Sequence, residues 1–169
     1  MRIINLAIKK QYKLTKLSIM KFSRLLINGV IIFIGIGLYF LLIETLGLAD
    51  QIYLRLLNFV FVIYGVNRTI KSNYQDGING YLTNLLAGFL TGMVGLILGL
   101  IAFMVYIEAQ GGDEFLKNFA DSYVFGGGDP SLYQFCFGLF IEGAASSMIV
   151  SFAMMQYWKD KVEKINKVD

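Results

Sequence analysis

The sequence predicts an all-α integral membrane protein with four transmembrane helices, both termini in the cytoplasm and a short amphipathic helix in an outer loop. Three observations predict this fold: an excess of apolar residues, four long apolar stretches, and basic residues gathered on one side of them. Charged residues make up 16% of the 169 residues, whereas soluble chains carry about 25%. So few polar side chains cannot cover a globule in water, which indicates a bilayer. The length fits one domain, so residues 1–169 are expected to form a single membrane domain.

Four stretches approach or exceed the length of a membrane helix. Such a helix needs about 20 mostly apolar residues to cross about 30 Å of hydrocarbon, and continuous apolar runs favour helices over barrel strands. The predicted spans cover residues 25–43, 52–66, 81–107 and 132–158. The second span is the shortest and contains Arg55 and Asn58. Gly47-Leu48-Ala49 resembles a signal-peptidase site, but the apolar run before it exceeds the roughly 7–15 residues of a signal peptide, so we interpret that run as a span.

Basic residues lie almost entirely in segments that a four-span chain places on one side. Thirteen of the fifteen Lys and Arg residues fall in residues 1–24, 67–80 and 159–169. The opposite side, residues 44–51 and 108–131, contains seven acidic residues and one basic residue, Lys117. Because Lys and Arg accumulate in cytoplasmic loops, the charges predict that both tails and the turn between the second and third spans are cytoplasmic.

The basic tail, residues 1–24, is expected to meet the lipid bilayer. Lys9, Lys13 and Lys16 are spaced i, i+4 and i+7, so a helix here would present them together to anionic lipids. Alternatively, the tail is a basic flank that sets the topology of the first span. Charges beside a span already have such a role, so nucleic acid is not an expected partner. A second copy of the chain or another membrane protein stays open as a partner.

The outer loop, residues 108–131, is predicted to contain the amphipathic helix. Glycines near both ends interrupt helical structure. Between them, residues 113–125 place Phe115 and Phe119 along one helical side, with Leu116 nearby. We therefore expect a short helix on the outer surface that connects the third and fourth spans.

The third span carries a row of glycines at steps of four, three and four residues. These are Gly88, Gly92, Gly95 and Gly99. They fall on one face of a helix, and small residues let helix backbones approach closely in lipid. The row therefore predicts a packing groove. The small residues of the fourth span are the obvious partner within the chain, and a second copy is the alternative.

Glu142 is the one acidic residue deep inside a predicted span. Ten residues from the outer end place it roughly 15 Å deep at 1.5 Å per residue. An ionisable group at that depth is costly, and is by default a functional hypothesis. Three interpretations stay open: an ion pair with Arg55, a protonated carboxyl hydrogen-bonded to Ser146, Asn58 or a backbone carbonyl, and a carboxylate that couples transport.

Other polar and aromatic residues lie near the ends of the spans. Asn28, Asn67 and Asn84 either form a polar layer at the cytoplasmic side or cap and hydrate helix ends. Tyr157 and Trp158 belong to the aromatic residues expected at the inner membrane interface. We interpret these aromatic side chains as anchors without a chemical role.

Several short motifs occur in the order found in one bacterial family. They are Gly77-Ile78-Asn79-Gly80-Tyr81, Val105-Tyr106-Ile107, Glu114-Phe115-Leu116, and a fourth span with Gly143 that ends in Lys159. Over residues 24–164 the chain resembles the small membrane proteins, frequent in Bacteroidota, that are grouped as domain of unknown function 4199. The resemblance implies a multi-pass protein of the bacterial inner membrane and assigns neither an activity nor site residues.

The composition also limits the function classes. The chain has no His and a single Cys, so Ser-His-Asp or Cys-His catalysis, zinc sites of the Cys/His kind and disulfides within the chain are excluded. We expect no catalytic residues, no cofactor and no metal, and hence no enzyme. The predicted function is a structural or accessory role through helix–helix packing. The alternative is a small transporter, channel or oligomeric pore that uses Glu142.

Overall fold

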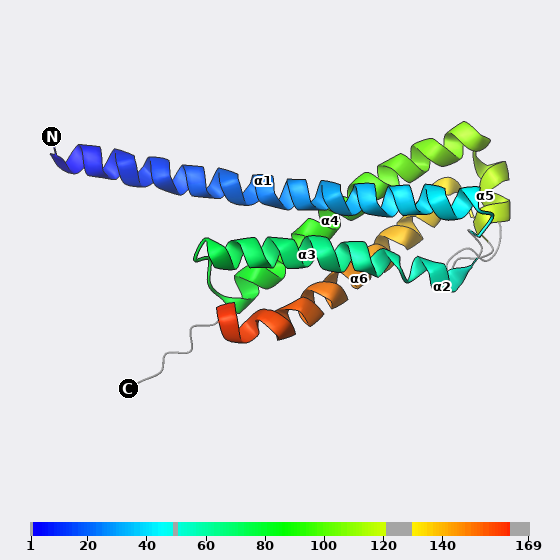
Figure 1. The fold of residues 1–169 in the computed structure, drawn as a ribbon. Coiled ribbons are helices and arrows are strands. Elements are labelled where there is room, and N and C mark those ends of the chain that lie inside the picture. Colours follow the sequence, from blue (N-terminus) through cyan, green and yellow to red (C-terminus); the bar gives the residue numbers. More distant parts are fainter. Residues whose placement is uncertain (1, 49–50, 121–129, 163–169) are drawn as a thin grey trace.

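The computed structural model describes residues 2–48, 51–120 and 130–162, and this part of the chain is all-helical. Its helices are α1 (Arg2–Thr45), α2 (Ile52–Arg55), α3 (Asn58–Gln75), α4 (Tyr81–Gln110), α5 (Asp113–Ala120) and α6 (Leu132–Val162). The long helices α1, α3, α4 and α6 alternate in direction, so α1 and α4 run one way and α3 and α6 run the other (Figure 1). At one end, the Gly80 N–H before α4 donates a 3.0 Å hydrogen bond to the carbonyl of Val162, the last residue of α6.

Three helices are long and apolar enough to cross a membrane. The apolar stretches are Phe22–Thr45 in α1, Tyr81–Gln110 and Leu132–Val162. They contain the first, third and fourth predicted spans, each extended by two to four residues at one or both ends. The prediction of an all-helical protein with apolar helices of membrane-spanning length is therefore confirmed for these three.

The second predicted span has different helical bounds. Instead of one helix over residues 52–66, α2 ends at Arg55, Leu56 and Leu57 form a turn, and α3 continues to Gln75. The second half of α3 is polar in sequence, but Thr69 and Asn73 are buried. Hydropathy predicts that the span ends at Val66, because the residues after it are mostly polar and polar residues are expected to face water.

The basic tail is helical and continuous with the first span. Helix α1 runs for 44 residues from Arg2 to Thr45, and its N-terminal part extends beyond the other helices in Figure 1. No break separates the tail from the span. Whether this part of α1 contacts anionic lipids stays a prediction.

Helix α4 occupies the centre of the bundle. It shares this place with α3, because each of the two contacts the other three long helices, whereas α1 and α6 lie on opposite sides of them. One apolar cluster lies at the end where α3 meets α4, and contains Val66, Ile70, Leu85, Val150, Met155, Trp158 and Val162. A second cluster at the opposite end contains Ile107, Leu116, Leu132, Phe135 and Cys136.

The predicted amphipathic helix is present as α5, from Asp113 to Ala120. Its Leu116 is fully buried against α4 and α6, so the apolar side of α5 packs on the protein. Asp113 Oδ1 accepts a 3.0 Å hydrogen bond from the Leu132 N–H, which caps the start of α6. The rest of the predicted segment, residues 121–125, lies outside the described residues.

Candidate functional site

The predicted glycine face of α4 meets different neighbours along its length. A Cβ placed at Gly92 would lie 2.6 Å from Ser147 Oγ on α6, and one at Gly95 would lie 2.9 Å from Ile32 Cγ2 on α1. At Gly88 the nearest atom is Val66 Cγ1 on α3, at 3.0 Å. All three distances are too short for an unshifted side chain, so these glycines bring α4 close to three helices of its own chain.

Gly99, the last glycine of that face, differs from the others. A Cβ at Gly99 would meet no atom within 4 Å, and the same holds for Gly37 on α1. Both glycines line a cavity of about 630 Å³ between α1, the α2–α3 junction, α4 and α6. Gly92 and Gly95 line the same cavity, so along this face its wall changes from close contact with α6 and α1 to open space at Gly99.

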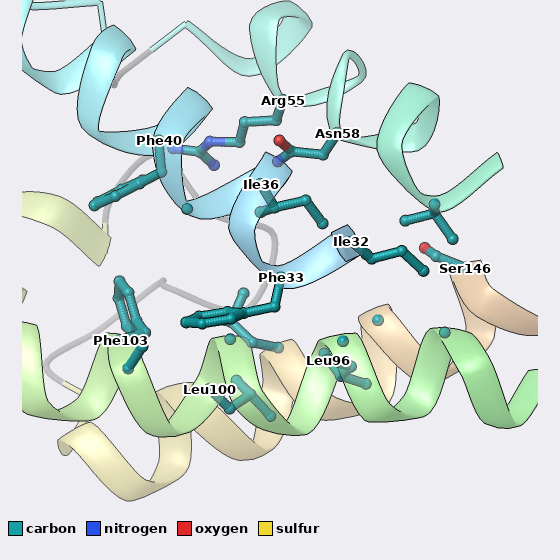
Figure 2. A pocket seen from close by; sticks show the side chains of 18 of the residues that line it. Ile32, Phe33, Ile36, Phe40, Arg55, Asn58, Leu96, Leu100, Phe103 and Ser146 are labelled. Atoms are coloured by element: carbon teal, nitrogen blue, oxygen red, sulfur yellow. The ribbon is translucent and has the colours of Figure 1, made fainter. Parts of the chain in front are cut away.

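The cavity gathers the four intramembrane polar residues that the sequence singles out. Arg55 ends α2 and Asn58 begins α3, while Glu142 and Ser146 lie one turn apart on α6, and all four line the cavity. Figure 2 shows Arg55 and Asn58 extending beside each other toward α1, with Ser146 to their right. The spacing explains the placement of Arg55 and Asn58, because residues three apart lie on the same side of a helical segment, and Leu56 and Leu57 between them keep right-handed helical dihedral angles.

The remaining cavity wall is apolar and partly aromatic. Figure 2 shows Phe33 and Phe40 from α1 and Phe103 from α4 around the space. Among the polar lining groups, the Oδ1 atom of Asn58 is buried and has no hydrogen-bond partner in the described residues. Glu142 is exposed at the surface of the isolated chain. Its pairing with Arg55 or with Ser146, raised by the sequence, stays a prediction.

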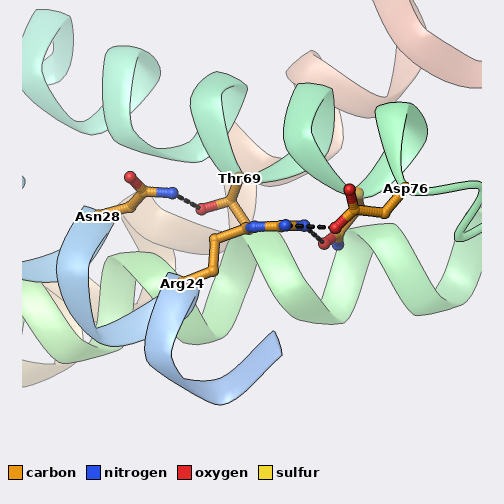
Figure 3. A network of polar contacts seen from close by, with 5 residues as sticks. Arg24, Asn28, Thr69 and Asp76 are labelled. Carbon is orange, nitrogen blue, oxygen red and sulfur yellow. Dashed lines mark hydrogen bonds and ion pairs between the residues drawn. The ribbon is translucent and has the colours of Figure 1, made fainter. Parts of the chain in front are cut away.

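A series of hydrogen bonds between buried side chains joins helices α1, α3 and α4. Asn28 Nδ2 on α1 donates to Thr69 Oγ1 on α3 at 2.8 Å, and the Thr69 and Thr91 hydroxyl oxygens are 2.9 Å apart. Thr91 Oγ1 itself donates to the Ala87 carbonyl at 2.8 Å. Because the Thr91 hydroxyl uses its single hydrogen on the Ala87 carbonyl, the Thr69 hydroxyl must be the donor to Thr91. The side chains of Asn28, Thr69 and Thr91 are all buried, so these bonds hold α1, α3 and α4 in register. Figure 3 shows the bond between Asn28 and Thr69.

Further polar contacts close the same end of the bundle. Arg24 forms an ion pair with Asp76, and its Nη1 donates to Asn73 Oδ1 at 3.0 Å (Figure 3). These contacts fix α1 to the end of α3. Together with the hydrogen bonds above, they form a polar layer between α1 and its neighbours.

The other two asparagines that the sequence singles out also have defined partners. Trp158 Nε1 donates to Asn67 Oδ1 at 2.8 Å, which joins α6 to α3. Asn84 Nδ2 donates to the carbonyls of Ile78 and Gly80, at 3.1 and 3.0 Å. Asn67 thus joins two helices, whereas Asn84 holds the turn before α4.

The sequence did not predict the partners in these contacts. Thr69 and Asn73 on α3 and Asp76 directly after it recur at steps of four and three, which is a helical polar stripe. This spacing predicts that one side of α3 is polar, but it does not predict that Arg24 and Asn28 of α1 lie opposite that side. The close-approach glycines of α1 and α3 were missed as well: Gly29 faces Val94, and Gly65 faces Ile32.

At the other end of the bundle, tyrosine hydroxyls fix α1 beside the cavity. Tyr39 donates to the Leu54 carbonyl of α2 at 2.9 Å, and Tyr106 of α4 donates to the Glu44 carboxylate. These bonds hold α1 to α2 and to α4. The helices around the cavity are therefore connected on both sides of it.

Neither a metal-binding cluster in the described residues nor a similar known protein assigns a function to the cavity residues. Within the described residues there is no cluster of three or more His, Cys, Asp or Glu side chains that could hold a metal ion. No family model, curated protein or solved structure matches the chain. The resemblance to domain of unknown function 4199 therefore stays a prediction.

Proposed function

We propose that the chain is a four-pass protein of a bacterial inner membrane with both termini in the cytoplasm. The helix directions support this topology, because α1 and α4 run the same way and the chain between Thr45 and Tyr81 must therefore cross back. Helix α3 lies antiparallel to α1 and buries Thr69 and Asn73 against its neighbours, so these polar groups do not face lipid. The basic residues at one end fit the positive-inside rule. The inner membrane itself rests on the family resemblance.

Cysteine labelling tests the topology. In a Cys136→Ser background, we expect Glu114→Cys on α5 to react with a membrane-impermeant maleimide in intact spheroplasts. Gln75→Cys at the end of α3 should react only after the membrane is opened, because α3 returns the chain to the cytoplasm. Both positions are exposed, so access from one side decides the outcome. Reaction of Gln75→Cys without permeabilisation would contradict the return of the chain through α2 and α3.

We further propose that the protein has a structural or accessory role based on helix packing. The observation that carries this proposal is that polar and small side chains inside the bundle contact other helices of the same chain. Asn28, Thr69 and Thr91 bond to one another, and Gly92 and Gly95 contact neighbouring helices, all within the chain. The outward faces are mainly large apolar side chains, which suit lipid or a membrane partner.

A small transporter, channel or pore is the second candidate. Glu142 supports it, because this carboxylate lies on the wall of a cavity and not within a sealed helix contact. A carboxylate at membrane depth is a typical element of a proton or cation pathway.

Reconstitution combined with crosslinking separates the two functions. For an accessory protein we expect no proton or monovalent-cation flux in liposomes, together with a crosslinked complex containing a second copy or a membrane partner at native expression level. Flux that Glu142→Gln abolishes and Glu114→Gln leaves intact would overturn the accessory role in favour of transport. Recovery of the monomer alone from cells would also count against it.

A further inference from the structure

The cavity contains open space at two helical glycines, where a larger side chain would fit without a clash. Gly37 and Gly99 stand on two of its walls and contact nothing within 4 Å, although Gly92 and Gly95 on the same α4 face are in close contact with α6 and α1. Glycine inside a helix lowers its stability relative to alanine. Helix packing explains Gly92 and Gly95, but it does not explain Gly37 and Gly99. Their effect is to keep about 630 Å³ free, which is within the range of small-molecule sites.

The polar groups on the cavity wall define the head group that would fit. Arg55 is a hydrogen-bond donor and Glu142 offers a hydrogen-bond acceptor on the same wall, so the lining presents both kinds of polar partner. The Glu142 carboxylate is a hydrogen-bond acceptor, and the Asn58 amide presents either N–H or oxygen according to its orientation. The Asn58 Oδ1 atom still lacks a partner. These groups suit a neutral head group that both donates and accepts hydrogen bonds.

The apolar part of the cavity wall favours a ligand that contains an aromatic ring and an apolar chain. Phe33, Phe40 and Phe103 surround the space in Figure 2, and aromatic rings pack favourably in edge-to-face and offset arrangements. Glu142 is exposed, so the cavity is reached from the surface that would face the bilayer. A ligand would therefore arrive from the lipid phase.

We propose that this cavity binds a neutral lipophilic molecule with a hydroxylated aromatic ring, whose hydroxyl donates to Glu142 and whose ring packs among the three phenylalanines. Binding of this kind is independent of whether the protein is an accessory component or a transporter.

A matched pair of probes tests the proposal. The full chain in phosphatidylcholine nanodiscs is heated with increasing 4-nonylphenol or with 4-nonylanisole, its methyl ether, which cannot donate a hydrogen bond. A ligand that binds the folded state raises the unfolding midpoint according to its concentration and affinity. We expect 4-nonylphenol to raise the midpoint and 4-nonylanisole to bind at least tenfold more weakly.

Variants place the effect in the cavity. Glu142→Met removes the acceptor, and Gly99→Leu puts a side chain into the open space, so each should weaken 4-nonylphenol binding at least tenfold. Glu114→Gln on α5 and Ala153→Leu on the exposed side of α6 lie outside the cavity and should bind like the parent. If Gly99→Leu does not fold, Gly37→Leu fills the same cavity from α1.

Three outcomes would overturn the proposal. Equal midpoint shifts with both probes would mean that the compounds only partition into the bilayer. Unchanged binding by a folded Gly99→Leu or Gly37→Leu variant would place the ligand elsewhere. A midpoint shift with dodecylamine and none with 4-nonylphenol would identify a cationic ligand instead.

Discussion

Gly92→Leu is expected to lower the stability of the bundle by about 1–3 kcal/mol, the usual cost of overpacking a close contact. A Cβ at this position would lie 2.6 Å from Ser147 Oγ and 2.8 Å from Ser147 Cβ, so α4 and α6 must separate to admit any side chain. Separation also weakens the contacts of Gly88 with Ser151, one turn away on the same interface. The midpoint of thermal unfolding in detergent micelles, followed by helical circular dichroism, measures the loss.

Gly99→Leu is the matched control for this prediction. It lies on the same helix and the same face, but a Cβ there meets no atom within 4 Å. Leucine favours a helix over glycine by up to about 1 kcal/mol, so this variant should be as stable as the parent or slightly more stable. Equal destabilisation by the two substitutions would show that loss of glycine, and not the contact with Ser147, determines stability.

The apolar runs were sufficient to predict three of the long helices, because backbone groups in a bilayer must bond within a helix. The same rule failed to place the bounds of α3. Its residues 67–75 are polar, and the sequence does not show that Thr69 and Asn73 are covered by α1 and α4. Hydropathy measures what a side chain prefers, whereas burial of α3 depends on partners that are distant in sequence.

The candidate site was predictable in its charged residues and not in its shape. Glu142 and Arg55 stand out because ionisable groups are rare inside spans, and both line the cavity. The open part of the cavity lies at Gly37 and Gly99, where no atom would meet an added side chain. A glycine row looks the same in sequence whether a neighbouring helix lies against it or not. Only the positions of α1 and α6 distinguish the two cases.

Trp158 shows the same limit for aromatic residues. Its position near the end of the last span predicts an anchor at the membrane interface, and Tyr157 beside it satisfies the same rule. In the structure Tyr157 is 63% exposed, whereas Trp158 is only 6% exposed and packs in the cluster with Val66 and Met155. The anchor interpretation is therefore wrong for Trp158. A one-residue step turns a helical side chain by about 100°, which is enough to separate lipid from core.

Trp158→Ala should be the most destabilising of the single substitutions considered, by about 3–5 kcal/mol, because it leaves a large cavity in the apolar cluster. It also removes the 2.8 Å hydrogen bond from Trp158 Nε1 to Asn67 Oδ1, which joins α6 to α3. The loss is measured as the shift in the unfolding midpoint on the same micelle-solubilised protein.

Tyr157→Ala supplies a close control, since the Lys161 ammonium lies 4.8 Å from the Tyr157 ring centroid and 4.7 Å from that of Trp158. Each substitution removes one such cation–π contact, so the difference between the two variants reports mainly on burial and on the Asn67 bond. Tyr157→Ala should change stability by about 0.5 kcal/mol or less, as exposed positions usually do. Trp158→Phe retains an aromatic ring but not the N–H, so it should cost less than Trp158→Ala and more than Tyr157→Ala. Equal effects of Trp158→Ala and Tyr157→Ala would mean that both rings act as interface anchors and that α6 does not pack on α3 through Trp158.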